Sequence, residues 1–509
     1  MNTNDTTTNT NGTTTANDTT ANTNDAMALP HPLIACIPIL VLVGMMVLIV
    51  KLFGNNALGG GVQIALLMST AVCVCLAMWV YKIKWRELEQ GIVHTIANSA
   101  VSLIILLLIG MMSASWMISG IVPTLIYYGV QIMSPTFFLF TTCLICAVVS
   151  VTTGSSWTTI ATIGVALIGI GSALGVPEYW SAGSIISGAY FGDKMSPLSD
   201  TTVLASSSAR INLFSHIKYL VFTTVPTLSI TLLIYFVAGF FIGSDGDVPI
   251  SEYTDGLSRT FDISLWTLVV PAVTALMILK KLPSLVILFV SALLAGVMAI
   301  IMQPDVLLSI GGNTEQTYSL NIVKGLLVTF FTSTNVETGS ATVNELVSTS
   351  GMGGMMDTIW LIVCAMCYGG VMMASRMIHS LAAQLIRVIR GTASLVASTA
   401  FAGVMNNVLI CDQYVSIIMT IDMFRDIYKE KGYEARLLSR STEDSSTVTS
   451  VLVPWNTCGM TQSTVLGVST LAYLPYCFFN LLSPLMSIII AAIGWKVVKP
   501  GKVAANDKC

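Results

Sequence analysis

The stretch that decides the fold is Ser284-Leu-Val-Ile-Leu-Phe-Val-Ser-Ala-Leu-Leu-Ala-Gly-Val-Met-Ala-Ile-Ile-Met302, which contains no charged residue. An apolar helix of about 20 residues spans the hydrocarbon core of a bilayer. Stretches of the same kind recur along the chain, at 33–50, 62–81, 97–118, 136–152, 160–175, 218–243, 264–280, 358–376, 393–411 and 478–498. We therefore expect an all-α polytopic membrane protein with about 11–13 transmembrane helices.

The composition excludes several classes of protein. Of the 509 residues, 54% are hydrophobic and only 10% are charged, and the mean hydropathy is +0.80. A soluble protein carries roughly 25% charged residues, which water solvates at its surface. The net charge of −3 leaves no basic excess for a polyanion. A cytosolic globule, a disordered chain and a nucleic-acid binder are thus excluded, and we expect a multi-pass protein of the bacterial inner (plasma) membrane.

The chain is expected to hold one transporter domain, over about 29–500, between two tails. Residues 1–28 are almost entirely Asn and Thr, so this tail is predicted to be disordered, and 501–509 form a short C-terminal tail. Within the domain, some segments are too short or too polar to span unaided, namely 121–133, 182–206, 321–350 and 440–475. Their Gly, Pro, Ser, Thr and Asn content predicts broken or re-entrant helices, which persist at membrane depth only inside protein or beside a wet cavity.

Charge placement predicts an orientation. Basic residues cluster at 82–86, at 280–281, between 425 and 440 and near the C-terminus, whereas the 244–262 loop is acidic. The positive-inside bias places the basic clusters in the cytoplasm and the acidic loop outside.

An internal repeat divides the domain into a first half of about 61–243 and a second half of about 264–498. Gly110-Met-Met-Ser-Ala-Ser-Trp-Met-Ile-Ser119 lines up with Gly370-Val-Met-Met-Ala-Ser-Arg-Met-Ile-His379. Downstream, we match the polar break at 154–159 with 406–412, and 199–202 with 444–447. Paired repeats with interrupted helices at matching positions are typical of secondary transporters, which bind substrate near the membrane midplane.

The densest polar segment in an apolar setting runs from Gly188 to Thr202 and holds Asp193, Lys194 and Asp200 among hydroxyl groups. Gly192 and Pro197 can interrupt a helix there and free backbone groups for a ligand. Carboxylates beside hydroxyls and carbonyls offer all-oxygen coordination, which suits a small hard cation such as Na⁺. Burial favours the neutral form of a carboxyl group, so such a site can exchange a proton for the cation.

Several of these charged residues can also have purely structural roles. Asp193 and Lys194 can neutralise each other, or Lys194 can bind a substrate carboxylate; Glu443 can be a surface charge paired with Arg440. Asp200 lies between apolar neighbours, where a charged side chain rarely has a purely structural role, so it is a candidate functional residue. Asp412, inside an apolar stretch, is a comparable candidate. Glu337 and Glu345 are expected in a loop.

Enzyme signatures are absent from the sequence, since it has no Walker A loop, no His-Glu-x-x-His and no nucleophile elbow. The eleven cysteines sit mostly in apolar runs and are interpreted as small buried side chains rather than metal ligands. We expect no cofactor, and transport driven by ion gradients.

Three motifs resemble a known family: 154–167 (Gly-Ser-Ser-Trp-Thr-Thr-Ile-Ala-Thr-Ile-Gly-Val-Ala-Leu), 184–202 (from Ser184 through Gly-Asp-Lys-Met-Ser-Pro-Leu-Ser-Asp-Thr-Thr202) and 453–459 (Val-Pro-Trp-Asn-Thr-Cys-Gly). Together they resemble the NhaC-type Na⁺/H⁺ antiporter family of the ion transporter superfamily, from about residue 33 to 500. The resemblance implies an inverted-repeat helical membrane fold and Na⁺/H⁺ exchange. The family also contains malate/lactate antiporters, so the motifs leave the solute open.

We therefore predict a Na⁺/H⁺ antiporter that works by alternating access, with Na⁺ and protons sharing intramembrane carboxylates. The candidate titrating groups and Na⁺ ligands are Asp200, Asp412 and Asp444. The full predicted site is formed by Ser155, Ser156, Thr158, Asp193, Ser199, Asp200, Thr201, Asn407, Asp412, Asp444, Ser445, Ser446 and Asn456. The sequence leaves the oligomeric state open, a homodimer included.

Two alternatives remain. One is a Na⁺- or H⁺-coupled exchanger or symporter of a small organic anion, such as malate or lactate, or of an amino acid, with Lys194 or a half-helix amino terminus receiving the anion. The other is a channel. Channels use rings from symmetric subunits, whereas internal repeats with buried carboxylates favour alternating access.

Overall fold

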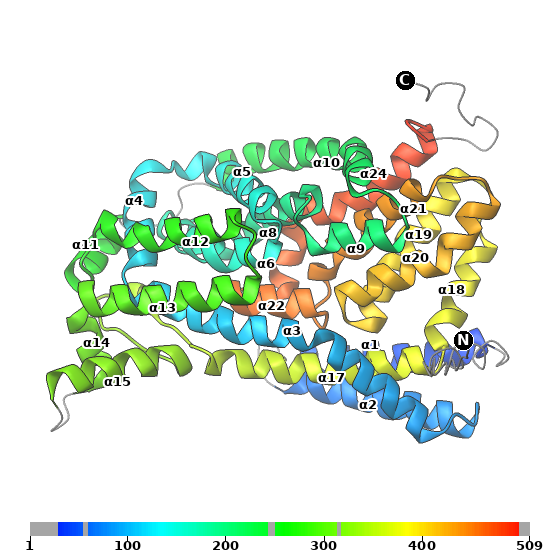
Figure 1. The fold of residues 1–509 in the computed structure, drawn as a ribbon, viewed down its shortest axis with the longest axis horizontal. Helices are drawn as coiled ribbons and strands as arrows, with labels where there is room; N and C mark the ends of the chain where they lie inside the picture. Colours follow the sequence, from blue (N-terminus) through cyan, green and yellow to red (C-terminus); the bar gives the residue numbers. More distant parts are fainter. Residues whose placement is uncertain (1–28, 54–59, 243–249, 313–316, 498–509) are drawn as a thin grey trace, which may run out of the picture.

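The computed structural model describes residues 29–53, 60–242, 250–312 and 317–497. Both predicted tails, 1–28 and 501–509, lie outside these residues. The described chain is helical, and its one β-type pairing is an isolated bridge between Thr334 and Thr349. The predicted all-α class is confirmed (Figure 1).

Nine of the described helices are long and apolar enough to cross a membrane. Their segments are α1 (Pro32–Phe53), α2 (Gly61–Trp79), α3 (Trp85–Ile118), α5 (Pro135–Thr153), α6 (Ser156–Thr159) running into α7 (Val165–Ala173), α10 (Leu213–Ile242), α13 (Ser284–Met302), α17 (Met356–Ala374) and α19 (Thr392–Ile410).

Two bent pairs raise the number of described spans to as many as eleven, the lower end of the predicted range. The first joins α11 (Ile250–Thr260) to α12 (Val269–Leu279) with a bend of 85°, and the second joins α23 (Thr470–Tyr473) to α24 (Phe478–Ile493) with a bend of 54°.

The shorter helices fall largely where the sequence is too short or too polar to span unaided. They are α4 (Ile121–Ile132), α8 (Glu178–Met195), α9 (Asp200–Ser208), α14 (Pro304–Gly311), α15 (Tyr318–Phe331), α16 (Ala341–Val347), α18 (Met377–Arg387), α20 (Gln413–Glu430), α21 (Ala435–Thr442) and α22 (Thr457–Leu466).

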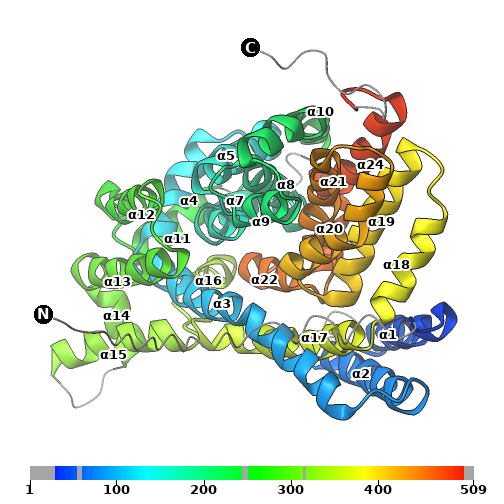
Figure 2. The same ribbon diagram turned by 45° about the vertical axis from the view of Figure 1, so that its right-hand side comes forward.

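The helices form two neighbouring groups with long helices alongside. In Figures 1 and 2, α4–α10 lie next to α19–α24, and α3 and α17 run past both groups. Helix α17 packs against α2 and α3, and α8 packs against α5 and α24. Figure 1 also places α11, which lies in the predicted acidic loop, and the junction of α20 and α21, which lies in the predicted basic cluster at 425–440, at opposite ends of the molecule. The assignment of these ends to inside and outside stays a prediction.

Glycines bring α5 and α8 unusually close together. A Cβ on Gly188 would lie 2.1 Å from the backbone oxygen of Cys143, and one on Gly192 would lie 2.5 Å from that of Ala147. Small residues four positions apart allow membrane helices to approach in this way. The prediction that Gly192 interrupts a helix is therefore wrong, because it lies within α8 and its role is close packing.

Helix breaks recur at matching places in the two halves. Gly154 (φ 70°) and Cys411 (φ 66°) are left-handed, and each is followed by an extended residue, Ser155 or Asp412, that caps the next helix. Further on, Ser196-Pro-Leu-Ser199 and Val453-Pro-Trp-Asn456 each begin extended and end in a helix-capping side chain.

These breaks agree with the predicted match between 154–159 and 406–412. They do not agree with the predicted match between 199–202 and 444–447. Ser199 corresponds to Asn456, and Asp444 lies instead inside the continuous helical stretch from Ala435 to Leu452. The match failed because both segments are rich in Ser and Thr. The repeat boundaries themselves stay predictions.

Candidate functional site

A buried carboxylate lies where α6, α8 and α9 meet. Asp193, in the last turn of α8, is 5% exposed. Its Oδ2 accepts a hydrogen bond from Ser156 Oγ at 2.7 Å, and its Oδ1 accepts one from Ser199 Oγ at 2.5 Å. The Ser199 hydroxyl is also 2.9 Å from that of Thr201. The two chain breaks of the first half thus converge on one carboxylate.

Asp193 lines a small cavity with a volume of about 40 Å³. A cavity of roughly 10–15 Å³ suffices for one water molecule, so this one admits a small ion. Its wall is rich in oxygen atoms, and it is lined by Ser102, Ile105, Gly154, Ser155, Trp157, Thr158, Asp193, Asp200, Thr201, Ser284, Gln413 and Tyr414. Carboxylate, hydroxyl and carbonyl oxygens are ligands that hard cations prefer.

A larger cavity of about 550 Å³ lies next to the small one and shares part of its lining. Ser155, Thr158 and Asp200 line both cavities, and Lys281 lines the larger one from the connection before α13. The two cavities are therefore neighbours.

Asp200 is exposed, in contrast to Asp193. It is the first residue of α9, directly after the capping Ser199, and it faces the cavities rather than the protein core. The partial positive charge of a helix amino terminus stabilises a carboxylate at this position. The buried carboxylate of the first half is therefore Asp193.

In the second half, Asp412 is 2% exposed and caps α20. Its Oδ1 accepts a hydrogen bond from the backbone N–H of Val415 at 3.0 Å, and its Oδ2 accepts one from Ser99 Oγ of α3 at 3.2 Å. The next two residues, Gln413 and Tyr414, reach the small cavity. Asp412 thus supports the wall of the cavity without lining it.

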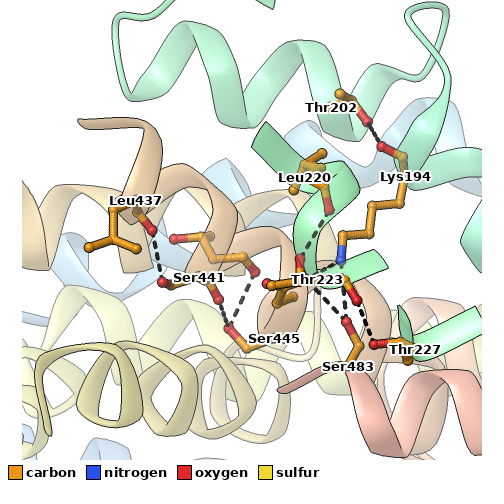
Figure 3. Close-up of polar contacts among 11 residues, drawn as sticks. Lys194, Thr202, Leu220, Thr223, Thr227, Leu437, Ser441, Ser445 and Ser483 are labelled. Atoms are coloured by element: carbon orange, nitrogen blue, oxygen red, sulfur yellow. Dashed lines mark hydrogen bonds and ion pairs between the residues drawn. The ribbon is translucent and has the colours of Figure 1, made fainter. Parts of the chain in front are cut away.

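The predicted site residues Asn407 and Asn456 form hydrogen bonds between the chain segments that flank the helix breaks of the second half. Asn407 Nδ2 donates to the backbone oxygen of Ser446 at 2.7 Å and to Thr449 Oγ1 at 2.9 Å. Asn456 caps α22, and its Nδ2 donates to the backbone oxygen of Asn407 at 3.1 Å. Ser445 Oγ donates within its own helix, to Ser441 (Figure 3). These residues hold the backbone in place and line none of the cavities described above.

Asp444 belongs to a second buried cluster, where it forms an ion pair with Lys194. Its Oδ1 also accepts hydrogen bonds from Thr223 Oγ1 at 3.1 Å and from Ser483 Oγ at 3.2 Å. Figure 3 shows Lys194 reaching from α8 toward Thr223 and Ser483. Helical residues point about 100° apart from one position to the next. Asp193 and Lys194 consequently face different partners, and the predicted pairing between them is wrong.

The predicted surface pair of Glu443 and Arg440 is also wrong. Both side chains are fully buried, and neither takes part in an ion pair among the described residues. The Arg440 guanidinium instead lies over the ring of Tyr219, 4.5 Å from its centroid.

The predicted residues therefore separate into groups. One group lies at the small cavity and consists of Ser155, Ser156, Thr158, Asp193, Ser199, Asp200 and Thr201. Asp412 is next to residues that line this cavity but does not line it, and Asp444 lies in the cluster with Lys194. Sequence reasoning missed Gln413 and Tyr414, although their position directly after Asp412 matches Ser156 and Trp157 of the first half. It also missed Ser99, Thr223 and Ser483, for which the sequence carries no signal beyond a hydroxyl in an apolar helix.

Within the described ranges, no group of three or more His, Cys, Asp or Glu residues could hold a metal ion.

Comparisons with known proteins find a family and several relatives that this chain is similar to. A family model described as "Na+/H+ antiporter family" matches residues 4–240 and 188–495. The malate-2H(+)/Na(+)-lactate antiporter of Bacillus subtilis (strain 168) is 32% identical, over 85% of this chain and 89% of that protein. The Na(+)/H(+) antiporter NhaC of Alkalihalophilus pseudofirmus (strain OF4) is 34% identical, over 83% and 88%. The arginine/ornithine antiporter ArcD of Halobacterium salinarum (strain NRC-1) is 32% identical, over 87% and 89%.

Proposed function

Because this chain belongs to the Na⁺/H⁺ antiporter family, whose members are multi-pass secondary antiporters and not enzymes, we propose that it exchanges Na⁺ for protons by alternating access. The observation that supports this proposal is Asp193, a buried carboxylate that two hydroxyl groups contact and that lines a cavity of ion size.

The chemistry follows from charge balance at Asp193. A buried carboxylate is stable when a proton or a cation neutralises it, since an unpaired buried charge is costly. Na⁺ and H⁺ therefore compete for the same oxygen atoms, and either occupant leaves the site with the same net charge. Ser155, Thr158 and Thr201 supply further oxygen atoms around the cavity. When the domain changes conformation, the site carries one ion or the other, which is antiport.

Access in this conformation runs through the larger cavity beside Asp200 and Lys281. Under the predicted orientation, the basic connection at 280–281 faces the cytoplasm. The conformation is accordingly assigned as open toward the inside.

Transport by purified protein in proteoliposomes, with imposed Na⁺ and pH gradients, tests the proposal. We expect a Na⁺ gradient to drive proton movement without any organic solute. If proton movement strictly requires malate, lactate, arginine or ornithine, simple Na⁺/H⁺ exchange is refuted.

A second candidate is exchange coupled to a small organic anion, which the size of the larger cavity favours. Its volume of about 550 Å³ exceeds the needs of Na⁺ and falls within the roughly 300–1,000 Å³ of small-molecule sites. Lys281 would receive the carboxylate there, because Lys194 is engaged by Asp444 and lines none of the cavities described. In the same proteoliposomes, this candidate requires that malate or lactate gradients drive Na⁺ flux and that Lys281→Gln weakens this effect.

A further inference from the structure

A third cavity, with a volume of about 280 Å³, is separate from the two cavities beside Asp193 and has no role in the exchange proposed above. Its wall is built by residues of α3, α4, α7, α16 and α22. Its rim includes Glu178, the first residue of α8, and Glu345 of α16, and both are exposed. Ile109, on its wall, is only 1% exposed. The third cavity therefore leads from the protein surface into the buried interior.

Helix α3 lines all three cavities with one face. Val101 and Ile105 line the larger cavity, and Ile105 also lines the small one. Farther along the helix, Ile109 and Ser113 line the third cavity. These positions are four residues apart, so they lie above one another on the same side of the helix. At 1.5 Å per residue, the step from Ile105 to Ile109 is about 6 Å. Along α3, the third cavity thus lies close to the small cavity and on the side away from the larger one.

Two further elements show the same succession. Where α6 runs into α7, Thr158 lines the small and the larger cavity, and Val165 lines the third cavity about 10 Å farther along. On α8, Asp193 lines the small cavity, whereas Glu178 lies at the rim of the third cavity about 22 Å away. That distance exceeds half of the roughly 30 Å thickness of a hydrocarbon core. The third cavity therefore opens toward the membrane face opposite to the one that Lys281 and the larger cavity face.

The barrier between the small and the third cavity contains an irregular helical segment. It is the π-helical turn Ile160–Gly164, which lies between Thr158 and Val165 and packs against α3 and α22. Within it, Thr162 is 6% exposed. Single π-helical turns inside α-helices are rare and frequently occur at functional sites. One such turn, rather than a thick layer of protein, separates the cation site from the third cavity.

The lining of the third cavity suits a cation. Its charged side chains are the carboxylates of Glu178 and Glu345, and none of the described residues that line it is Lys, Arg or His. Hydroxyl groups from several elements supply further oxygen atoms, among them those of Ser113 and Ser172. A cleft lined by charges of one sign concentrates counter-ions, in this case cations.

Resting on the Na⁺/H⁺ exchange proposed above, we propose that the third cavity is a second entrance to the cation site at Asp193, on the face opposite to the entrance beside Lys281. The π-helical turn Ile160–Gly164 is the gate of this entrance, and it is closed in this conformation. When the gate opens and the larger cavity closes, hydrated Na⁺ reaches Asp193 from the side of Glu178 and Glu345.

The first test compares three Ser→Cys variants. Ser113 lies in the third cavity, Ser284 lines the small and the larger cavity, and Ser229 is on the exposed side of α10 as a matched control. A membrane-impermeant quaternary-ammonium methanethiosulfonate is added to vesicles of each orientation. None of the described cysteines lines the three cavities, so wild-type protein gives the background. We expect Ser113→Cys to react from one face and Ser284→Cys from the other, each at least about tenfold faster than Ser229→Cys.

The same reagent tests whether the third cavity carries ions. Full labelling of Ser113→Cys should abolish Na⁺-driven proton flux in proteoliposomes, and removal of the adduct by a reductant should restore it. Labelled Ser229→Cys should keep wild-type flux. Reaction of Ser113→Cys from the same face as Ser284→Cys, or wild-type flux in fully labelled Ser113→Cys, would overturn the inference. If Ser113→Cys does not yield folded protein, Ser172→Cys on the α7 wall of the same cavity replaces it under the same two criteria.

Two more measurements test the carboxylates and the gate. Glu178→Gln combined with Glu345→Gln should lower the ratio of cationic to anionic (sulfonate) reagent rates at Ser113→Cys by about fivefold, whereas Glu430→Gln at the exposed end of α20 should not. A Na⁺ gradient that drives exchange should raise the labelling rate of Thr162→Cys from the Glu178 face at least about threefold, with no change at Ser229→Cys. An unchanged ratio contradicts the role of the carboxylates, and an unchanged Thr162→Cys rate contradicts the gate.

Failure of the Na⁺/H⁺ proposal itself would look different. Wild-type protein would then show no Na⁺-driven proton flux, while the faces from which Ser113→Cys and Ser284→Cys are labelled would stay as expected.

Discussion

Asparagine substituted for Asp193 or for Asp200 gives the sharpest test of the site, because the same chemical change is made at a buried and at an exposed carboxylate. The cavity of about 40 Å³ is lined by Asp193, so we take about 4 Å as the separation between a bound ion and the carboxylate. At this distance, and at an effective dielectric constant of about 20, the attraction is about 4 kcal/mol, or roughly a thousandfold in affinity. Asp200 is exposed, and in a water-like dielectric the same attraction is about 1 kcal/mol, or roughly fivefold.

The measurement is Na⁺ binding to protein in detergent, together with Na⁺-driven proton flux in proteoliposomes. Asp193→Asn should lose measurable Na⁺ binding and flux while remaining folded, since an amide can still hydrogen-bond both Ser156 and Ser199. Asp200→Asn should keep exchange with a several-fold higher half-saturating Na⁺ concentration. Wild-type Na⁺ binding in Asp193→Asn, or abolished exchange in folded Asp200→Asn, would refute the assignment of the buried carboxylate as the ion site.

Three further substitutions test packing and polar support. Gly188→Ala places a Cβ against the backbone of α5 and should cost about 1–3 kcal/mol, seen as a lower melting temperature, whereas Gly44→Ala meets nothing within 4 Å and should not lower it. Lys194→Met leaves Asp444 buried and unpaired, so it should lose about 3–5 kcal/mol of stability, and the double variant with Asp444→Asn should recover most of it in the same thermal assay. Ser199→Ala removes both a hydrogen bond to the buried carboxylate and the cap of α9, and it should weaken Na⁺ binding about tenfold; unchanged binding would contradict the hydroxyl's role.

The helices were largely predictable from the sequence, because the length of an apolar run is set by the thickness of the bilayer. The run from Ser284 to Met302 is the clearest case, since α13 begins and ends at these residues. The breaks were predictable for a related reason. Polar and helix-breaking residues inside an apolar chain need burial in protein, and 182–206 and 440–475 contain the breaks at 196–199 and 453–456.

The pairing of charges was not predictable, because it depends on helix faces and on residues distant in sequence. Asp193 and Lys194 are neighbours in the chain, which suggested mutual neutralisation, yet Lys194 pairs with Asp444 from the other half. The exposure of individual charged side chains was not predictable for the same reason. Glu443 was expected at the surface beside Arg440 and is fully buried, whereas Asp200 lies between apolar neighbours in the sequence but is exposed where a helix begins beside a cavity.

The two halves share their backbone breaks but not their carboxylates, and this asymmetry limits the number of ion sites. The position in the second half that corresponds to Asp193 is Ser450, whose hydroxyl donates to the backbone oxygen of Thr447 at 2.8 Å. Conversely, Asp412 corresponds to Ser155, and each of these two side chains caps the helix that follows it. A carboxylate that caps a helix has its charge compensated by backbone N–H groups, so it has less need of a cation than Asp193. We therefore expect one Na⁺ to bind per chain at Asp193, with Asp412 holding the cavity wall in place.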